Sequence, residues 1–245
     1  MKNLSENYRS IDLSIYRSKK ILGIETSTRA ASVALISDEK ILAEISQESK
    51  LYHSENLLPQ IEEVLKIANV EKVDAVAVSI GPGSFTGLRI GLAAAKALTY
   101  AWQIKIIGVL TLHAIAAHFP NSSALILPLI DAQKNSAYVQ PFKNSQPIED
   151  IAVKSIAEIL DAAGNSDDEI ILCGDVLHKI KSLPANVTFA PINLRMPRAV
   201  NVALCGKILL DAGNFANVMD LEPLYLRRSE AEILWDKNHK SSSEK

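Results

Sequence analysis

Residues 20–119 alternate between two patterns of apolar positions. Short continuous apolar runs, such as VDAVAVSI at 73–80, are typical of strands covered on both faces. In 53–68 the apolar residues instead recur at helical spacing, with charged residues opposite and Ser54 as the expected N-cap. The pattern predicts the order β-β-β-α-β-α-β-α, with strands at 21–27, 31–37, 40–47, 73–80 and 105–110 and helices at 53–68, 88–102 and 111–119.

A partly repeated pattern follows the breaking residues 120–123. No sequence repeat is visible, but the alternation predicts an α/β fold of two related halves, each a mixed sheet flanked by helices. The expected strands are 124–132, 136–142, 169–175 and 187–190, and the expected helices are 155–163 and 202–213. We expect subdomains at 20–120 and 121–228, between a disordered extension at 1–19 and a flexible tail at 229–245.

Composition narrows the class of protein. The chain has 245 residues, of which 48% are apolar and 22% charged, and only two cysteines, so it is no disulfide scaffold. Residues 21–224 carry 16 basic and 22 acidic side chains, a net charge of −6. A protein that holds an RNA backbone alone would carry the opposite sign, although a local basic patch remains an alternative. No apolar run reaches the ~20 residues of a membrane span, and we expect a cytoplasmic protein without membrane association.

The turn GPGSFTG offers the first candidate for chemistry. Gly81, Gly83 and Gly87 precede a helix, where backbone N–H groups attract phosphates. However, Leu88 stands where a P-loop has its lysine, and the spacing is not GxGxxG. The spacing alone therefore favours a tight turn that leads into a packed helix.

Acidic and hydroxyl side chains between the first two strands form a second candidate. Glu25, Thr26, Ser27 and Thr28 have the groups that hold a nucleotide's phosphates and magnesium, but such residues are also common in turns. Asp131 ends an apolar strand and either faces a cleft or caps a turn.

Small residues along the helix after the glycine turn indicate close helix packing. Gly87, Gly91 and Ala95 form a small-xxx-small series, which lets two backbones approach closely. The neighbour is either the 54–68 helix or a partner chain. The residues expected at a partner interface are Leu57, Leu58, Ile61, Leu65, Gly87, Leu88, Gly91, Ala94, Ala95 and Leu98.

The remaining reactive side chains suggest no catalytic residue and no metal site. His113 and His118 are five residues apart, so they point in different directions on a helix and are expected to be ordinary helix residues. Cys173 and Cys205 are expected to be core thiols.

Five segments closely resemble the TsaB family, also called YeaZ. They are ILGIETSTRAASVAL, HSENLLPQIEEVL, VDAVAVSIGPGSFTGLRIGLAAAKAL, DAQKNSAYV and PLYLRRSEAE, in order from about Lys20 to Glu232. The resemblance implies the fold of the actin-like ATPase, sugar kinase and Hsp70 (ASKHA) superfamily, with two ribonuclease-H-like subdomains. It also implies a role in making threonylcarbamoyladenosine next to the anticodon in tRNA.

The same resemblance implies partners and a division of labour. In the TsaB family's pathway, the paralogue TsaD transfers the threonylcarbamoyl group. This chain would bind TsaD as a heterodimer through helices 54–68 and 84–101, and would activate it. TsaE would join the complex, tRNA would be contacted indirectly, and the chain would pair with itself when TsaD is absent. ATP and magnesium would be used by the assembled pathway, with no cofactor on this chain alone. A Gly91→Trp change would then abolish TsaD binding.

The metal ligands of the paralogue are not matched here. By their offset from the preceding strand, Thr111 and Ile115 occupy the two positions of the HxxxH motif, and neither is a good metal ligand. This favours a subunit without intrinsic catalysis. The alternatives are a stand-alone ATPase or small-molecule kinase of the same fold, for which Glu25 and Asp131 are the obvious acids, and a metallopeptidase.

Overall fold

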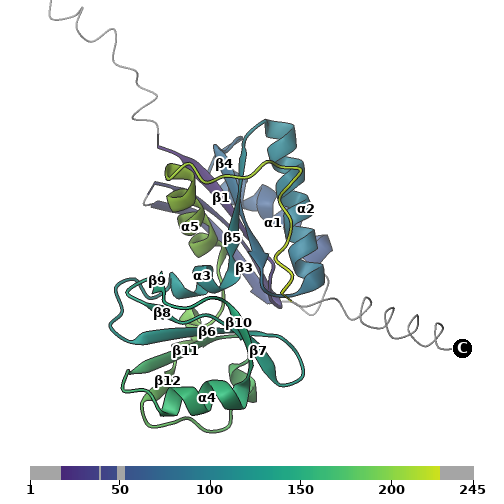
Figure 1. The fold of residues 1–245 in the computed structure, drawn as a ribbon. Helices are drawn as coiled ribbons and strands as arrows, with labels where there is room; N and C mark the ends of the chain where they lie inside the picture. The colour runs from purple at the N-terminus through teal and green to yellow at the C-terminus, as the bar shows by residue number, and fades with distance from the viewer. Residues whose placement is uncertain (1–17, 39, 49–52, 227–245) are drawn as a thin grey trace, which may run out of the picture.

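The computed structural model describes residues 18–38, 40–48 and 53–226 (Figure 1). The expected tail at 229–245 and all but the last two residues of the expected extension at 1–19 lie outside these ranges. The predicted order of strands and helices from 20 to 119 is confirmed, apart from small differences at the element ends. The first helix begins at His53, so Ser54 lies inside it rather than before it.

Five strands form the first sheet, in the order β3-β2-β1-β4-β5. Strands β1, β2 and β3 pair antiparallel, whereas β4 and β5 run parallel to β1. Their bounds are β1 Lys20–Glu25, β2 Ala30–Ser37, β3 Lys40–Glu48, β4 Ala75–Gly81 and β5 Lys105–Leu110.

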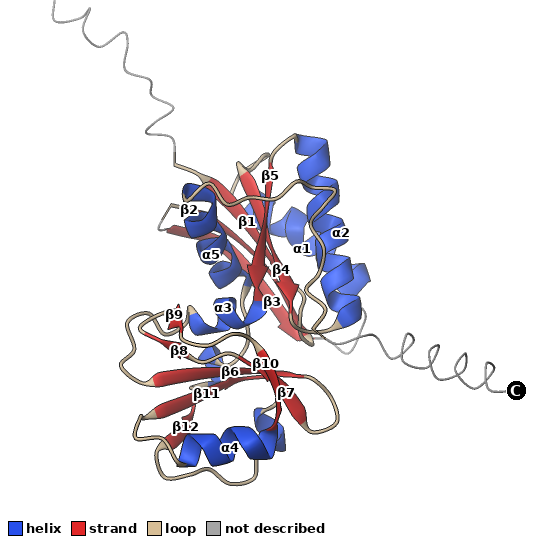
Figure 2. Ribbon diagram, in the orientation of Figure 1, coloured by secondary structure: helices blue, strands red, loops and turns tan. Residues whose placement is uncertain are grey.

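Helices cover both faces of this sheet (Figure 2). Helices α1 (His53–Ile67) and α2 (Phe85–Trp102) pack on one face, and α5 (Ala199–Asp211) packs on the other. Alternate residues of each strand enter the two cores, as Leu22 packs with α1 and α2 and Ile21 with α5. Because both faces are buried, the central strands β1 and β4 are mostly apolar rather than alternating with polar residues, whereas the edge strand β3 is partly exposed and contains polar residues.

The second sheet repeats this arrangement with the order β10-β7-β6-β11-β12. Helix α4 covers one face, while the short helix α3 lies between the two sheets and contributes to the cores of both. The strand order and directions match those of the first sheet, with β8 and β9 as an added hairpin. The elements are α3 Thr111–Ala116, β6 Leu125–Asp131, β7 Ser136–Val139, β8 Phe142–Lys143, β9 Gln146–Pro147, β10 Ala152–Ser155, α4 Ile156–Gly164, β11 Ile170–Gly174, η2 Leu177–Lys179, β12 Val187–Phe189 and η3 Ile192–Leu194.

Details at the strand ends show that the two halves are related. Each first strand ends in an acid whose carboxylate accepts a hydrogen bond from the backbone N–H two residues later. Ser27 N donates to Glu25 at 2.5 Å, and Gln133 N donates to Asp131 at 2.8 Å. Each fourth strand ends in a glycine with positive φ, at 111° in Gly81 and 112° in Gly174. The two related halves expected from the alternation are therefore present, although their sequences differ.

After η3 the chain returns to the first sheet. Helix α5 packs on that sheet so closely that an added Cβ on Gly23 would lie 2.1 Å from the Ala199 carbonyl oxygen. Residues 214–226, here called the C-terminal strap, then run along β5 and α2 (Figure 1). Ala216 bridges to Ile106 and Leu224 N donates to Ile80 O at 2.7 Å. The second subdomain was expected at 121–228, but α5 and the C-terminal strap, which lie in this range, pack on the first half. Helix α5 does so because it buries an apolar face of the first sheet.

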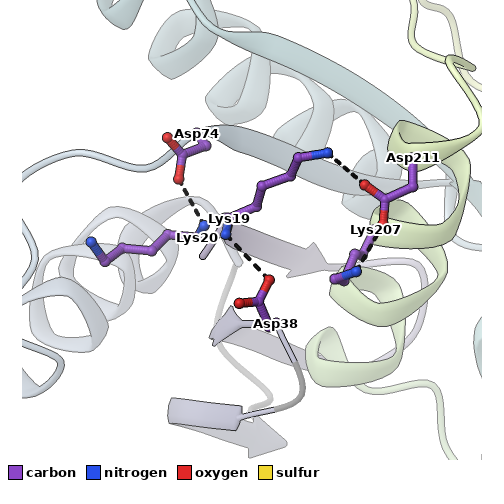
Figure 3. Close-up of polar contacts among 6 residues, drawn as sticks. All are labelled: Lys19, Lys20, Asp38, Asp74, Lys207 and Asp211. Carbon is purple, nitrogen blue, oxygen red and sulfur yellow. Dashed lines mark hydrogen bonds and ion pairs between the residues drawn. The ribbon is translucent and has the colours of Figure 1, made fainter. Parts of the chain in front are cut away.

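The first described residues are held to this half by polar contacts (Figure 3). Lys19 Nζ pairs with Asp211 of α5 at 2.6 Å, and Lys207 pairs with the other oxygen of that carboxylate at 2.8 Å. Lys20 N donates to Asp74 at 2.8 Å, while Lys19 N donates to Asp38 at 3.3 Å. Lys19 therefore belongs to the folded part, although it was expected in the extension. Within the described ranges, no helix has the length and apolar character needed to cross a membrane.

Candidate functional site

The acid and hydroxyl loop after β1 is buried against the glycine turn after β4. Glu25, Thr26, Ser27 and Thr28 are each at most 3% exposed. Ser84 N donates to Ser27 O at 2.7 Å, and the Thr26 hydroxyl donates to Gly87 O at 2.7 Å. The two loops predicted as phosphate-binding candidates thus hydrogen-bond to each other, through one backbone pair and one hydroxyl. They leave no open surface at residues 25–28.

Glu25 is a fully buried carboxyl group. Burial raises its pKa, and hydrogen bonds from Ser27 and Ser79 partly oppose that rise. Both carboxyl oxygens have donors within the chain, since Ser27 N bonds Oε1 and the Ser79 hydroxyl bonds Oε2. The group therefore connects the ends of β1 and β4, which are neighbouring strands, by hydrogen bonds.

The other acid proposed for nucleotide chemistry lies in the second sheet. Asp131 ends β6 and accepts a hydrogen bond from Gln133 N, so it caps the turn, which was one of its two predicted roles. Its carboxylate also pairs with Lys179 at 2.7 Å. Nearby, Asp131 N donates to Asp175, and burial raises the pKa of that carboxyl. Glu25 and Asp131 therefore have separate sets of partners.

The small residues of α2 face inward, not toward a partner. Gly87, Gly91, Ala95 and Thr99 are all buried. A Cβ on Gly87 would lie 2.0 Å from Thr26 O, and one on Gly91 would lie 2.3 Å from the Thr26 hydroxyl oxygen. The prediction that these glycines admit a second helix is therefore wrong. They admit the loop after β1, whose backbone needs the space that side chains would fill.

The expected interface residues divide between the core and the surface. Those in the core are Leu57, Ile61, Gly87, Leu88, Gly91 and Ala95. Leu58 is 54% exposed, and Leu65, Ala94 and Leu98 are half-buried. Only these four of the predicted set reach the outer surface of α1 and α2. For the rest, helical spacing identified the correct apolar stripe, but the stripe packs on the chain's own sheet.

The outer surface of α2 has its own regular row of residues, which the sequence reasoning missed. Phe85, Arg89, Ala93, Ala97 and Ala101 are spaced four apart, and all are exposed. Each lies two positions from a member of the buried row, which is about 200° around a helix. The i, i+4 spacing of the alanines was the signal for this row, but nothing local told it apart from the buried one.

Residues at the positions of the paralogue's metal ligands are buried in the core. Thr111 and Ile115 are both 0% exposed, and Ile115 packs with Leu112 and Phe142. His113 packs edge-on against Phe142, with ring centroids 5.0 Å apart, and burial lowers its pKa. His118 contacts Met196 O at 3.0 Å, and burial lowers its pKa as well. Across the described residues, no group of three or more His, Cys, Asp or Glu side chains is placed to hold a metal ion.

Both cysteines have raised thiol pKa values because they are buried. Cys173 is 0% exposed in the second core, and Cys205 is half-buried on α5 with a pKa of about 11. Such thiols are protonated near neutral pH and are poor nucleophiles. This agrees with the predicted role of both as core side chains.

Two sheets with the same 3-2-1-4-5 strand order and helices on both sides define the class of this protein. It has the ASKHA fold, with two ribonuclease-H-like subdomains. A solved structure described as YeaZ from Pseudomonas aeruginosa has a TM-score of 0.71, with 22% identity, over 85% of this chain and 100% of that one.

Sequence comparison gives the family. The family model described as "TsaD: tRNA N6-adenosine threonylcarbamoyltransferase" matches residues 40–235. The Bacillus subtilis protein named "tRNA threonylcarbamoyladenosine biosynthesis protein TsaB" is 30% identical over 235 residues, covering 90% of this chain and 99% of the relative. The Haemophilus influenzae protein of the same name is 28% identical, covering 89% of this chain and 96% of the relative. The chain belongs to the TsaB (YeaZ) family, within the broader family that the TsaD model describes.

Proposed function

We propose that this chain acts in threonylcarbamoyladenosine biosynthesis as the subunit that binds and activates a TsaD homologue for transfer to tRNA. The name shared by its TsaB relatives supports the pathway. The observation that carries the subunit role is the exposed apolar surface of α1 and α2. It includes Leu58, which is 54% exposed, and Tyr100, which is 64% exposed. Exposed apolar surface of this kind is typical of protein interfaces.

The outer row of α2 is suited to contact with another helix. Ala93, Ala97 and Ala101 present only methyl groups, so a facing helix can approach closely and bury Leu58 and the half-buried Leu65 and Leu98 around it. This row replaces the buried glycine series as the proposed contact surface. The same surface would allow the chain to pair with itself when the partner is absent.

In this complex, the partner would carry the catalytic residues. This assignment is supported by Thr111 and Ile115, which occupy the paralogue's ligand positions and are buried in the core. It is also supported by the closed loop at Glu25–Thr28, where a kinase or ATPase of this fold would need an accessible acid. ATP and magnesium would then be used by the assembled pathway, in which TsaE also takes part, and tRNA would be held chiefly by other subunits.

An omission assay tests this function. Threonylcarbamoyl transfer to tRNA is reconstituted from the cognate pathway proteins, with and without this chain. We expect modification to be lost on omission, and no transfer by this chain alone. Full modification without the chain would refute the role, and ATP turnover by the purified chain would favour the stand-alone kinase or ATPase.

A matched pair of variants tests the surface. Ala97→Arg places a long charged side chain in the exposed row of α2, and we expect it to abolish binding to the TsaD homologue without unfolding the chain. Ile208→Arg is the control, because Ile208 is 70% exposed on α5, on the opposite face of the first sheet. Equal binding by both variants would contradict the proposed surface.

A further inference from the structure

One arginine on the outer row of α2 is held in a fixed position by two aromatic rings. The Arg89 guanidinium carbon lies 3.8 Å from the centroid of the Phe85 ring and 5.8 Å from that of Tyr225. Arg89 Nε donates a hydrogen bond to the Tyr225 hydroxyl at 3.0 Å. The two rings contact each other with centroids 4.9 Å apart. The side chain is therefore fixed by stacking and by one directional hydrogen bond.

Tyr225 reaches this position because two hydrogen bonds, one to α2 and one to β4, hold the C-terminal strap just before it. Lys96 of α2 donates to Met219 O at 3.2 Å, and Leu224 N donates to Ile80 O at 2.7 Å. These contacts place Tyr225 beside the first turns of α2, although it is 136 residues from Arg89. The GSFTGLR segment and residues 223–226 thus lie together at the surface, where Phe85, Arg89 and Tyr225 form what is here called the aromatic–arginine cluster.

The charge of Arg89 is not neutralised inside this part of the molecule. Among the residues that the structure describes, no carboxylate lies within ion-pair distance of Arg89, and the first turn of α2 has no acidic residue. The Nε–H is used by Tyr225, so the two terminal Nη groups remain as donors toward solvent. Their planar fork matches the two oxygens of a carboxylate.

The cluster is continuous with the proposed partner surface. Arg89 lies one turn from Ala93 and two from Ala97 in the same exposed row. Phe85 is 37% exposed and Tyr225 43%, so the arginine has an apolar, partly exposed rim. Arginine and aromatic residues are the types that most often dominate binding energy at interfaces. The rim also favours a protein over RNA, since Arg89 is the one arginine of α2 and residues 21–224 carry a net charge of −6, which offers little to a phosphate backbone.

We propose that Arg89 binds an Asp or Glu side chain of the protein that docks on α1 and α2, and that Tyr225 is the residue that positions it. This inference rests on the proposed function, because it assumes that a protein partner covers this surface. The arginine pays little conformational entropy on binding, since its rotamer is already set by Phe85 and Tyr225. The C-terminal strap therefore contributes to recognition through a side chain on α2.

Affinity measurements with the cognate TsaD homologue test the inference. We expect Arg89→Glu to weaken binding by about 100-fold and Arg89→Lys by about tenfold, because lysine keeps the charge but loses the planar fork. Tyr225→Phe keeps the ring and removes the hydroxyl, and we expect a loss of a few-fold. The loss caused by Arg89→Gln should shrink at high salt, which a purely structural role would not produce. Unchanged thermal unfolding of the variants is the control for folding.

A charge exchange identifies the bound group. Replacement of surface Asp or Glu residues of the partner by Lys, one at a time, should give one variant that restores binding to Arg89→Glu. If wild type binds, Ala97→Arg does not, and all Arg89 variants bind as wild type does, the inference fails while the proposed function stands. If wild type does not bind, the proposed function itself fails.

Two further outcomes would overturn the inference in favour of other ligands. Glu230 and Glu232 follow the strap in the sequence, and the double variant Glu230→Gln, Glu232→Gln tests them in the full chain. If this change removes the effect of Arg89→Glu on binding, the carboxylate belongs to the chain itself. If Arg89→Glu weakens binding of tRNA to the chain and leaves partner affinity unchanged, the ligand is a phosphate of RNA.

Discussion

Gly87→Ala should destabilise the fold, although glycine to alanine normally stabilises a helix. In an open helix the change gains up to about 1 kcal/mol. Here the new methyl group would lie 2.0 Å from Thr26 O, a backbone atom that cannot turn away. We therefore expect the loop after β1 to move, with consequences for the buried contacts around it.

The size of the effect follows from two costs. Overpacking of a tight contact costs ~1–3 kcal/mol. Separation of Thr26 from Gly87 also breaks their buried hydrogen bond of 2.7 Å, at ~1–3 kcal/mol. After the gain in helix propensity is subtracted, we expect a net loss of about 1–5 kcal/mol in the free energy of unfolding. For a domain of this size, that corresponds to a fall of roughly 2–20 °C in Tm.

The measurement is urea and thermal unfolding, followed by circular dichroism, of a matched pair. Ala97→Gly makes the reverse change in the exposed row, and we expect it to cost only about 1 kcal/mol through helix propensity. If Gly87→Ala is as stable as wild type, α2 does not contact the loop after β1 as described. The same reasoning changes the expectation for Gly91→Trp, which should lose partner binding by unfolding the first half rather than by blocking a surface.

Two further predictions concern carboxyl groups. Burial raises the pKa of Glu25 above 4.5, so the folded state binds the proton of this carboxyl group more tightly than the unfolded state does. We therefore expect wild type to lose stability relative to Glu25→Gln as the pH rises above 4.5. Urea midpoints from about pH 4 to pH 8 measure that difference, and a difference independent of pH would contradict the buried carboxyl. Lys19, with Lys207, lowers the pKa of Asp211 below 3.8, so its stabilisation is present above that pH and lost below it. Because the pair is largely exposed, Asp211→Asn should cost less than ~1 kcal/mol, and ~0.5 M NaCl should reduce the cost.

Local sequence patterns predicted most of the elements. The apolar runs marked the central strands of the first sheet, such as β1 and β4, since both faces of the sheet are covered there and these strands are mostly apolar. The main strand missed was β10. It is only four residues long and partly exposed, and its apolar residues show no clear periodicity. The C-terminal strap was missed because it has little regular structure and is held by single contacts such as Leu224 N to Ile80 O.

The roles of the candidate site residues depended on contacts distant in the chain. Spacing showed that Gly87, Gly91 and Ala95 share one face of a helix, but not what that face meets. Thr26, which fills the space beside the glycines, lies 61 residues before Gly87. Likewise, the acid and hydroxyls at 25–28 had the composition of a phosphate loop, and only the packing of the 81–87 turn showed that they are buried.

The sequence by itself determined the family, the order of strands and helices, and which residues share a face, because periodicity and motifs are properties of neighbouring positions. The tertiary structure decided which of two opposite rows on α2 is buried and brought Tyr225 to Arg89 across 136 residues. These outcomes depend on which segments compete to cover a given apolar face. That competition is settled by the packing of the whole chain, so no local pattern contains it.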